Sequence, residues 1–374
     1  MLTHHDKRSY QEAASDAAAR AREKLTGLIE RGCTRAAAVI EQVENQIPED
    51  AIVRGRALTF TGSEQGIKLA TGDQVGLGGF LVHDHALHQA SEKAGVPWRY
   101  VQELRGTDWG RDLVAHNLNE ILRRSDGRHL VRSVGGEVRG MLSDKFRRLD
   151  SRPVLEAFTA AVSRLGAVPI EGYAMATKFT LKALLPRIFE PVPNEVMAFG
   201  LALSNSDFGD GALSLRVFML RLWCTNYAIT DEALRQVHLG GRLSDTVEFS
   251  DRTMRLDTAR SASMIRDITD TELGPDRVGQ VCELIRKADE EKLAGPAIRA
   301  FLDKHVGKGD SEAIREAFNS ADVEMLPPGQ TAWRLSNAIS WVAGKAEDDG
   351  RKLDLMRVAG LALPGHGRLH GEQN

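Results

Sequence analysis

The amino-acid sequence predicts an α+β protein, with a central antiparallel sheet, a basic β-hairpin and a covering helix, plus an N-terminal helical arm and a helical C-terminal region. Three observations support this fold class. An alanine-rich segment with helical spacing comes first, short apolar runs separated by glycine-containing turns follow, and helical spacing returns in the last third of the chain. With 374 residues, 42% of them hydrophobic and 27% charged, the chain can bury a sizeable core.

The first element is an N-terminal helical arm, for which we assign residues 1–50. Residues 9–46 are rich in Ala, Glu and Arg, and Leu25, Leu28, Val39 and Val43 recur at spacings of three and four. The pattern ends before Pro48, a residue that cannot continue a helix. Such an arm can dock on its own domain or on a neighbouring subunit, and we expect a homo-oligomer.

An α+β core domain is expected over residues 51–228. Weak strands at 57–60, 67–69 and 77–82 precede two short helices, one opening after Asp84 and one behind Pro97, and a helix within 110–124. The clearest hairpin joins 129–134 to 137–142 through Gly135-Gly136, a dipeptide suited to a primed turn. An amphipathic helix over 154–165 then covers a sheet of four antiparallel strands, at 168–176, 178–184, 196–204 and 212–223.

The remainder of the chain is predicted to be mostly helical. A helical region over 229–324 contains helix starts at 230–233 and 258–268 and helices at 276–293, 296–305 and 311–318. Residues 327–329, Pro-Pro-Gly, mark a linker. A C-terminal helical pair is expected within 325–363, and a disordered tail over 364–374.

Composition excludes several classes of protein. No apolar run approaches the length needed to span a bilayer, and the N-terminus lacks the pattern of a signal peptide. Cys33, Cys224 and Cys282 are odd in number and far apart, which excludes a disulfide framework and a four-cysteine zinc site. We therefore expect a cytoplasmic protein without a membrane partner.

Charge is distributed unevenly along the chain, although the net charge is only −3. Residues 121–152 contain nine basic and four acidic residues, whereas residues 267–349 contain seventeen acidic and ten basic ones. A basic hairpin region and an acidic helical region therefore coexist in a nearly neutral protein.

The basic region is the main candidate site for nucleic acid. Arg132 and Arg139 are near cross-strand neighbours in the hairpin, where like charges destabilise each other unless an anion lies between them. Guanidinium groups bind phosphate oxygens, so the segment suits a nucleic-acid backbone, with six candidate contacts: Arg132, Arg139, Lys145, Arg147, Arg148 and Arg152. The alternative interpretation is a solvated sheet face on which the arginines pair with Glu137, Asp144 and Asp150.

Other residue groups give weaker indications of chemistry. His83, His85 and His88, with a nearby acid, have a spacing compatible with a hydrolytic metal, but we favour a helix N-cap with an exposed helix start, since side chains at a strand end that runs into a helix need not converge. Cys224 has no histidine close in sequence, which favours a structural thiol over a nucleophile. We predict no metal, no other cofactor and no catalytic residue.

Several motifs together resemble a known family. They are the run from Met141 to Asp150, the run from Leu203 to Gly209, the run from Arg221 to Asn226, His238 to Arg242, and Asn337 to Trp341. This ordered set resembles the phage/plasmid-like proteins built on the domain of unknown function 932, although Tyr227 stands where that family would lead us to expect glycine. The resemblance implies a mobile-element protein and a motif without assigned roles: Asn205, Ser206, Gly209, Cys224, Thr225 and Asn226.

These observations lead to one main hypothesis and two alternatives. The main hypothesis is non-enzymatic binding of single-stranded nucleic acid, most simply DNA, in recombination, repair or replication of a phage or plasmid. The order of strands and helix in the middle of the chain is also similar in outline to single-strand annealing proteins. The alternatives are a metal-dependent phosphodiesterase using the histidines, and an adaptor that binds protein through the acidic helices.

Overall fold

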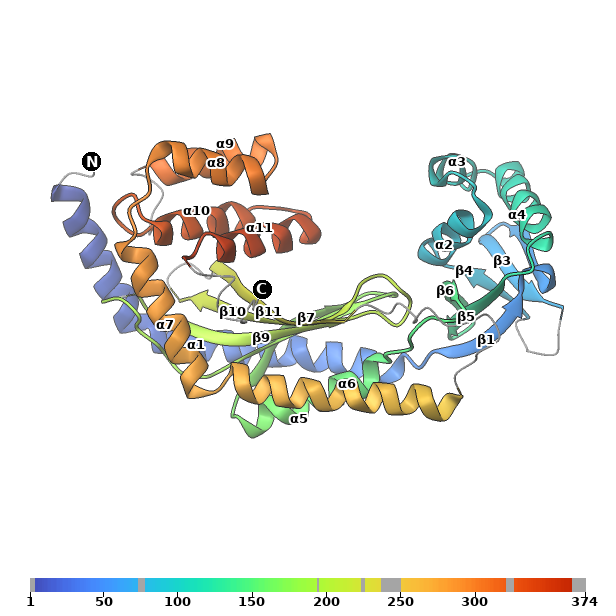
Figure 1. The fold of residues 1–374 in the computed structure, drawn as a ribbon, viewed down its shortest axis with the longest axis horizontal. Helices are drawn as coiled ribbons and strands as arrows, with labels where there is room; N and C mark the ends of the chain where they lie inside the picture. Colours follow the sequence, from blue (N-terminus) through green and yellow to red (C-terminus); the bar gives the residue numbers. More distant parts are fainter. Residues whose placement is uncertain are drawn as a thin grey trace, which may run out of the picture.

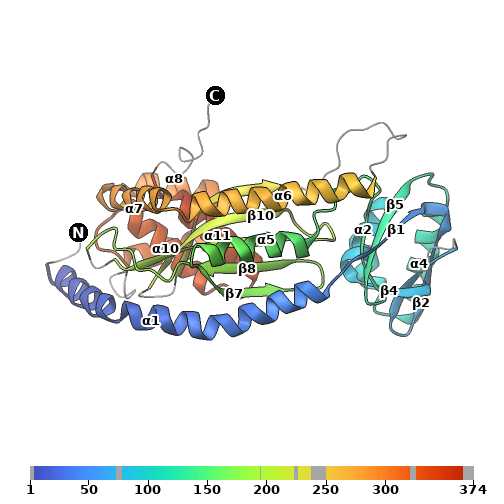
Figure 2. The ribbon, with the colours of Figure 1, turned by 90° about the horizontal axis from the view of Figure 1, so that it is seen from below.

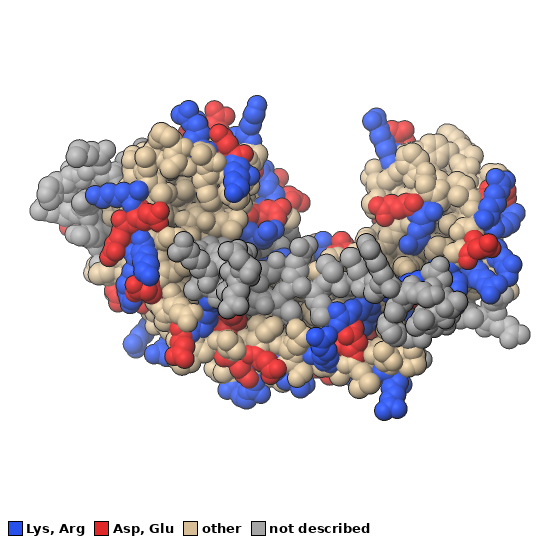
Figure 3. All heavy atoms as spheres, viewed as in Figure 1, with Lys and Arg blue, Asp and Glu red and all other residues tan. Residues whose placement is uncertain are grey.

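The protein is divided into a small and a large lobe, each built around its own sheet (Figure 1). The computed structural model describes residues 4–72, 78–193, 195–222, 226–236, 250–320 and 326–364. A hollow separates the upper parts of the two lobes, and acidic and basic side chains are interspersed on both sides of it (Figure 3). The predicted α+β fold class is confirmed.

The N-terminal arm is one long helix, α1 (His4–Asn45), which lies along the large lobe (Figure 2). It packs on β7 (Val168–Ala174), an edge strand of the large sheet. Gly32 allows this contact, because a Cβ atom at that position would lie 2.1 Å from the carbonyl oxygen of Ile170. The helix thereby covers an edge that would otherwise be open to pairing with another chain.

The small lobe contains a six-stranded sheet in the order β1-β5-β6-β4-β3-β2. All neighbouring strands are antiparallel except β4 and β6, which are parallel. The strands are β1 (Glu49–Arg54), β2 (Leu58–Ser63), β3 (Gly66–Thr71), β4 (Gly78–Val82), β5 (Arg128–Val134) and β6 (Glu137–Ser143). A 3₁₀ turn (Gly55–Ala57) joins β1 to β2, and three helices pack on the sheet, namely α2 (Asp84–Ala94), α3 (Trp98–Leu104) and α4 (Asp108–Arg123).

Two local features of the small lobe determine its hairpin turn and cover its edge strand β2. Gly135 and Gly136 have φ values of +58° and +81°, which a primed turn requires, so the predicted hairpin of β5 and β6 is confirmed. At the other side of the sheet, the Asn119 side chain in α4 accepts a hydrogen bond from the Phe60 N–H (2.7 Å) and donates one to the Phe60 carbonyl oxygen (2.8 Å). This amide pairs with the edge strand β2 as a neighbouring strand would.

The large lobe contains a five-stranded antiparallel sheet in the order β11-β10-β9-β8-β7. Four of its strands were predicted: β7, β8 (Phe179–Leu184), β9 (Met197–Asn205) and β10 (Leu213–Arg221). The predicted helix start at 230–233 is wrong, since these residues belong to β11 (Asn226–Gln236). Pairing with β10 along its whole length, with two register shifts, outweighs a local sequence pattern that resembles a helix cap.

Helices cover both faces of the large sheet. On one face, α5 (Ser151–Arg164) and α6 (Asp251–Glu272) bury Phe158 and Ile265 against alternating leucines such as Leu181 and Leu203, and α5 is the predicted covering helix. Helices α7 (Pro275–Glu290), α10 (Ala332–Gly344) and α11 (Asp349–Leu361) enclose a second core with Phe218. Helices α8 (Gly295–His305) and α9 (Lys308–Asn319) lie beyond α10 and α11 (Figure 1).

Some sequence predictions fall outside the described part of the chain. They are the tail beyond Pro364, the run from His238 to Arg242, and Cys224 with Thr225. Among the described residues, no helix is long and apolar enough to cross a membrane.

Candidate nucleic-acid interface

Arg132, the first candidate contact, lies in β5 with a side chain that is only 2% exposed. Its Nε donates to Asp50 (2.6 Å), one Nη to Asp150 (2.7 Å) and the other Nη to the carbonyl oxygen of Asp207 (2.8 Å). Burial opposes the charge of Arg132, but the neighbouring carboxylates outweigh it and raise the pKa of the guanidinium. All three donor groups are satisfied internally, so Arg132 offers no free face to a phosphate.

These contacts join the two lobes, and we call Asp50, Arg132, Asp150 and Asp207 the lobe junction. Arg132 and Asp50 come from the sheet of the small lobe, whereas Asp207 lies in the turn between β9 and β10 of the large lobe. The Asp207 carboxylate accepts hydrogen bonds from the N–H and the hydroxyl group of Ser151, both at 2.7 Å. Burial, the largest cause, raises the pKa of Asp207 from 3.8 to about 6, although the positive charge of Arg132 lowers it in part.

The motif from Asn205 to Gly209 lies at the contact between the two lobes. Asn205 donates to the carbonyl oxygen of Leu149 (2.7 Å), and Ser206 donates to that of Thr177 (2.7 Å). Gly209 has a φ of +79°, and a Cβ atom there would lie 2.8 Å from Leu142 of the small lobe. The motif therefore shapes a turn that fits against the other lobe. Asn226 begins β11, where it pairs with Arg221 of β10.

A glutamine in α2 completes the contact between the lobes. Gln89 accepts a hydrogen bond from the Met141 N–H of β6 (2.7 Å) and donates to the carbonyl oxygen of Phe208 (2.9 Å). Nε2 of His85 lies 3.0 Å from the same oxygen. One side chain thus links a strand of the small lobe to the turn of the large lobe.

Arg139 occupies a position similar to that of Arg132, at the rim of the hairpin. It donates to Glu137 (2.8 Å) and to the carbonyl oxygen of Ala176 in the large lobe (3.2 Å), and its side chain is 16% exposed. The Arg139–Glu137 and Arg132–Asp150 pairs are among those that the solvated-face interpretation expects. The two arginines are therefore held by different carboxylates instead of sharing one anion.

The four remaining candidates lie between β6 and the first turn of α5. Arg147 forms a bidentate ion pair with Asp257 of α6. An Nη atom of Arg148 lies 3.2 Å from a carboxylate oxygen of Asp50. Lys145 is half-buried. Arg152 is the most open of the six, with a side chain that is 54% exposed and pairs with Glu156 one turn along α5. The structure thus spreads the six residues over a buried junction and a surface edge next to α6.

The most open positive surface near them lies on α6, and the sequence analysis did not identify it. Arg252, Arg255, Arg260 and Arg266 are all exposed, whereas Thr258, Ala262 and Ile265 of the same helix are buried. None of them binds a carboxylate among the residues that the structure describes. We call these four residues the α6 arginine face.

The acidic residues of α6 are mostly engaged elsewhere. Asp257 binds Arg147, Asp270 binds Arg164 at 2.6 Å, and Glu272 binds Arg277 at 2.7 Å. The arginine face runs from Arg252 to Arg266, fifteen residues whose ends lie about 21 Å apart at 1.5 Å per residue. The predicted helix began at residue 258, so Arg252 and Arg255 were not placed on it. The signal that identifies the earlier start is Ser250, whose side chain caps the helix by accepting from the Thr253 N–H.

The three histidines at the start of α2 have separate local contacts. The His83 ring accepts a hydrogen bond from the His85 N–H and is the N-cap of α2, so the cap lies one residue before Asp84, the N-cap that the sequence pattern predicts. His85 faces Phe208, and His88 stacks beside Trp98 with a ring-centroid distance of 4.8 Å. Among the described residues, no three histidine, cysteine or acidic side chains converge as metal ligands would.

The chain was compared with protein-family models, curated proteins and solved structures, and nothing matches. The resemblance to phage/plasmid-like proteins therefore stays a prediction from the motifs.

Proposed function

We propose that this protein binds single-stranded nucleic acid without catalysing a reaction, and that the α6 arginine face is its main contact surface. The observation that carries the proposal is the set of four exposed arginines without carboxylate partners among the described residues. Arginine binds phosphate oxygens through two parallel hydrogen bonds, and a row of such residues neutralises several phosphates of one strand.

The surroundings of α6 are consistent with a polyanion. Arg152 lies at the start of the neighbouring helix α5, which packs beside α6 (Figure 2). Leu256 is 61% exposed between the arginines and offers an apolar contact to bases, which a single strand exposes and a duplex stacks away. In this proposal the protein acts in recombination, repair or replication of a phage or plasmid, and a homo-oligomer would multiply the contacts along a strand.

Fluorescence anisotropy with a labelled single-stranded DNA of about 20 nucleotides tests the proposal. Four phosphate contacts give a slope of about −2.8 in log K against log salt, so affinity should fall about 50-fold between about 50 and 200 mM salt. The double variant Arg255→Ala, Arg260→Ala should reduce the slope by about 1.4 and weaken binding at low salt.

A matched control removes the same charge elsewhere. Arg99, in α3, is 90% exposed, and Arg357, in α11, is 53% exposed. The variant Arg99→Ala, Arg357→Ala should retain the salt slope of the unmodified protein. Absence of binding to the single strand at low salt would refute the function, and an equal loss in the two double variants would refute the assignment of the surface.

A further inference from the structure

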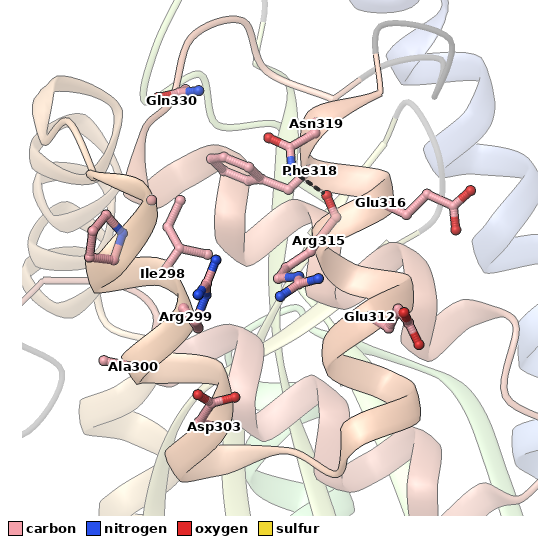
Figure 4. Close-up of a pocket in the computed structure, with 12 residues that line it drawn as sticks. Ile298, Arg299, Ala300, Asp303, Glu312, Arg315, Glu316, Phe318, Asn319 and Gln330 are labelled. Carbon is pink, nitrogen blue, oxygen red and sulfur yellow. Dashed lines mark hydrogen bonds between the residues drawn. The ribbon is translucent and has the colours of Figure 1, made fainter.

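A groove between α8 and α9 lies on the far side of the large lobe from α6 (Figures 1 and 4). Its volume is about 890 Å³, within the range of small-molecule sites. Ile298 of α8 and Phe318 of α9 are 5% and 3% exposed and contribute apolar surface to its floor. The size of the groove is sufficient for a ligand as large as a nucleotide.

Two arginines face each other across the groove. Arg299 comes from α8 and Arg315 from α9, and their guanidinium groups point toward one another in Figure 4. Neither forms an ion pair with a carboxylate in the described part of the chain, although three acids also line the groove, Asp303 and Glu312 at its lower end and Glu316 on α9. Two like charges repel each other across this gap, and an anion placed between them would remove the repulsion.

The floor of the groove is fixed from behind by Arg334. This buried side chain donates to the carbonyl oxygens of Phe318 (2.7 Å), Pro327 (2.7 Å) and Ser320 (2.8 Å). Its guanidinium carbon also lies 5.7 Å from the centre of the Phe318 ring. The position of Phe318 therefore does not depend on a ligand, and a preformed floor reduces the entropy lost on binding.

Polar amides lie at the end of the groove opposite Asp303 and Glu312. The Asn319 side chain donates to the carbonyl oxygen of Arg315 (2.8 Å), which orients it and leaves its own oxygen as an acceptor. Gln330 lies beyond it in Figure 4. Amide side chains pair with the edge of adenine, where a donor and an acceptor stand side by side.

We propose that this groove binds an adenine nucleotide, with the phosphate between Arg299 and Arg315 and the base on the apolar floor toward Asn319 and Gln330. The order of amides, apolar floor and paired arginines along the groove matches the order of base edge, base face and phosphate in such a ligand. The site is separate from the α6 arginine face and does not depend on the proposed function.

Isothermal titration of the full-length protein with AMP, adenosine and inorganic phosphate tests this site. AMP should bind at least about tenfold more tightly than adenosine, since a charge-assisted hydrogen bond contributes more than one factor of ten, and more tightly than phosphate, which lacks the contacts of the base. Arg299→Ala and Arg315→Ala should each weaken AMP binding about tenfold or more. Lys304→Ala, in the same helix but outside the groove lining, should leave it unchanged.

Three results would overturn the proposal. They are no AMP binding up to about 10 mM, equal affinities for AMP and phosphate, or equal affinities for AMP and adenosine. Both arginines are exposed, so their substitution leaves the core intact, and unchanged thermal unfolding of each variant verifies this. The double variant of the α6 arginine face should bind AMP normally, which separates this site from the nucleic-acid surface.

Discussion

Arg132 provides the sharpest test of how the structure assigns the predicted basic residues, through the variant Arg132→Met. Methionine retains much of the apolar volume but removes the guanidinium that joins Asp50, Asp150 and the carbonyl oxygen of Asp207. Removing one partner from a buried ion pair costs about 3–5 kcal/mol, and we expect the lower end of this range, because Asp50 keeps Arg148 as a partner and Asp150 is 42% exposed. At about 2–4 °C per kcal/mol, a loss of about 3 kcal/mol lowers the unfolding midpoint by about 6–12 °C.

The assay is thermal and urea unfolding followed by circular dichroism, with Arg152→Met as the matched control. Arg152 lies in an exposed pair with Glu156, and such pairs contribute about 0.5 kcal/mol or less. Hydrogen exchange adds local information, because weaker contacts between the lobes should increase exchange at the Met141 N–H, which donates to Gln89.

The same variants separate structure from binding. Well below its unfolding midpoint, Arg132→Met should bind single-stranded DNA as the unmodified protein does, since the side chain is buried. If Arg132→Met unfolds within about 1 kcal/mol of the unmodified protein but loses DNA affinity, then Arg132 contacts the ligand and its assignment to the lobe junction fails.

Two further predictions concern pH and packing. Burial raises the pKa of Asp207 to about 6, so this group stabilises the fold fully below about pH 4 and loses that contribution as the pH rises through 6. Asp207→Asn keeps the oxygen that accepts from Ser151. Between pH 4 and pH 7, its free energy of unfolding should therefore rise by about 3 kcal/mol relative to that of the unmodified protein, as measured by urea unfolding. A difference that does not change with pH would contradict the raised pKa. Gly32→Ala places a Cβ atom against Ile170 and should destabilise the protein by about 1–3 kcal/mol. In the control Gly27→Ala, the Cβ atom meets only the Arg31 side chain, so this variant should be neutral or stabilising by up to about 1 kcal/mol. Equal thermal midpoints of the two variants would show that α1 shifts freely.

Local patterns predicted much of the fold because their causes are local. The hairpin of β5 and β6 follows from two glycines between alternating runs, and the primed turn needs no distant partner. Helix α5 follows from its amphipathic spacing. Strand β11 could not be identified in this way, since Thr230 and Asp231 fit a helix start and only pairing with β10 selects the strand.

The candidate site depended on partners that are distant in sequence. Arg132 binds Asp50, 82 residues earlier, and Asp207, 75 residues later, so no local count of charges could show that it is neutralised. The nearby acids Glu137 and Asp150 did signal part of this pairing. The α6 arginines have no carboxylate partner in the described part of the chain for the converse reason: acids on their own helix bind Arg147 and Arg164 of other elements.

The segment between β6 and α5 connects these two results. Arg148 binds Asp50 in the small lobe through its side chain, and its carbonyl oxygen accepts from Thr258 of α6 at 2.8 Å. Its neighbour Arg147 binds Asp257 on the same helix. A charge reversal at these arginines therefore disrupts packing as well as surface potential, and a resulting loss of DNA binding would have two explanations. Substitution of Arg255 and Arg260 changes the potential alone, because neither side chain contacts a described carboxylate, and it is the variant that isolates the electrostatic contribution.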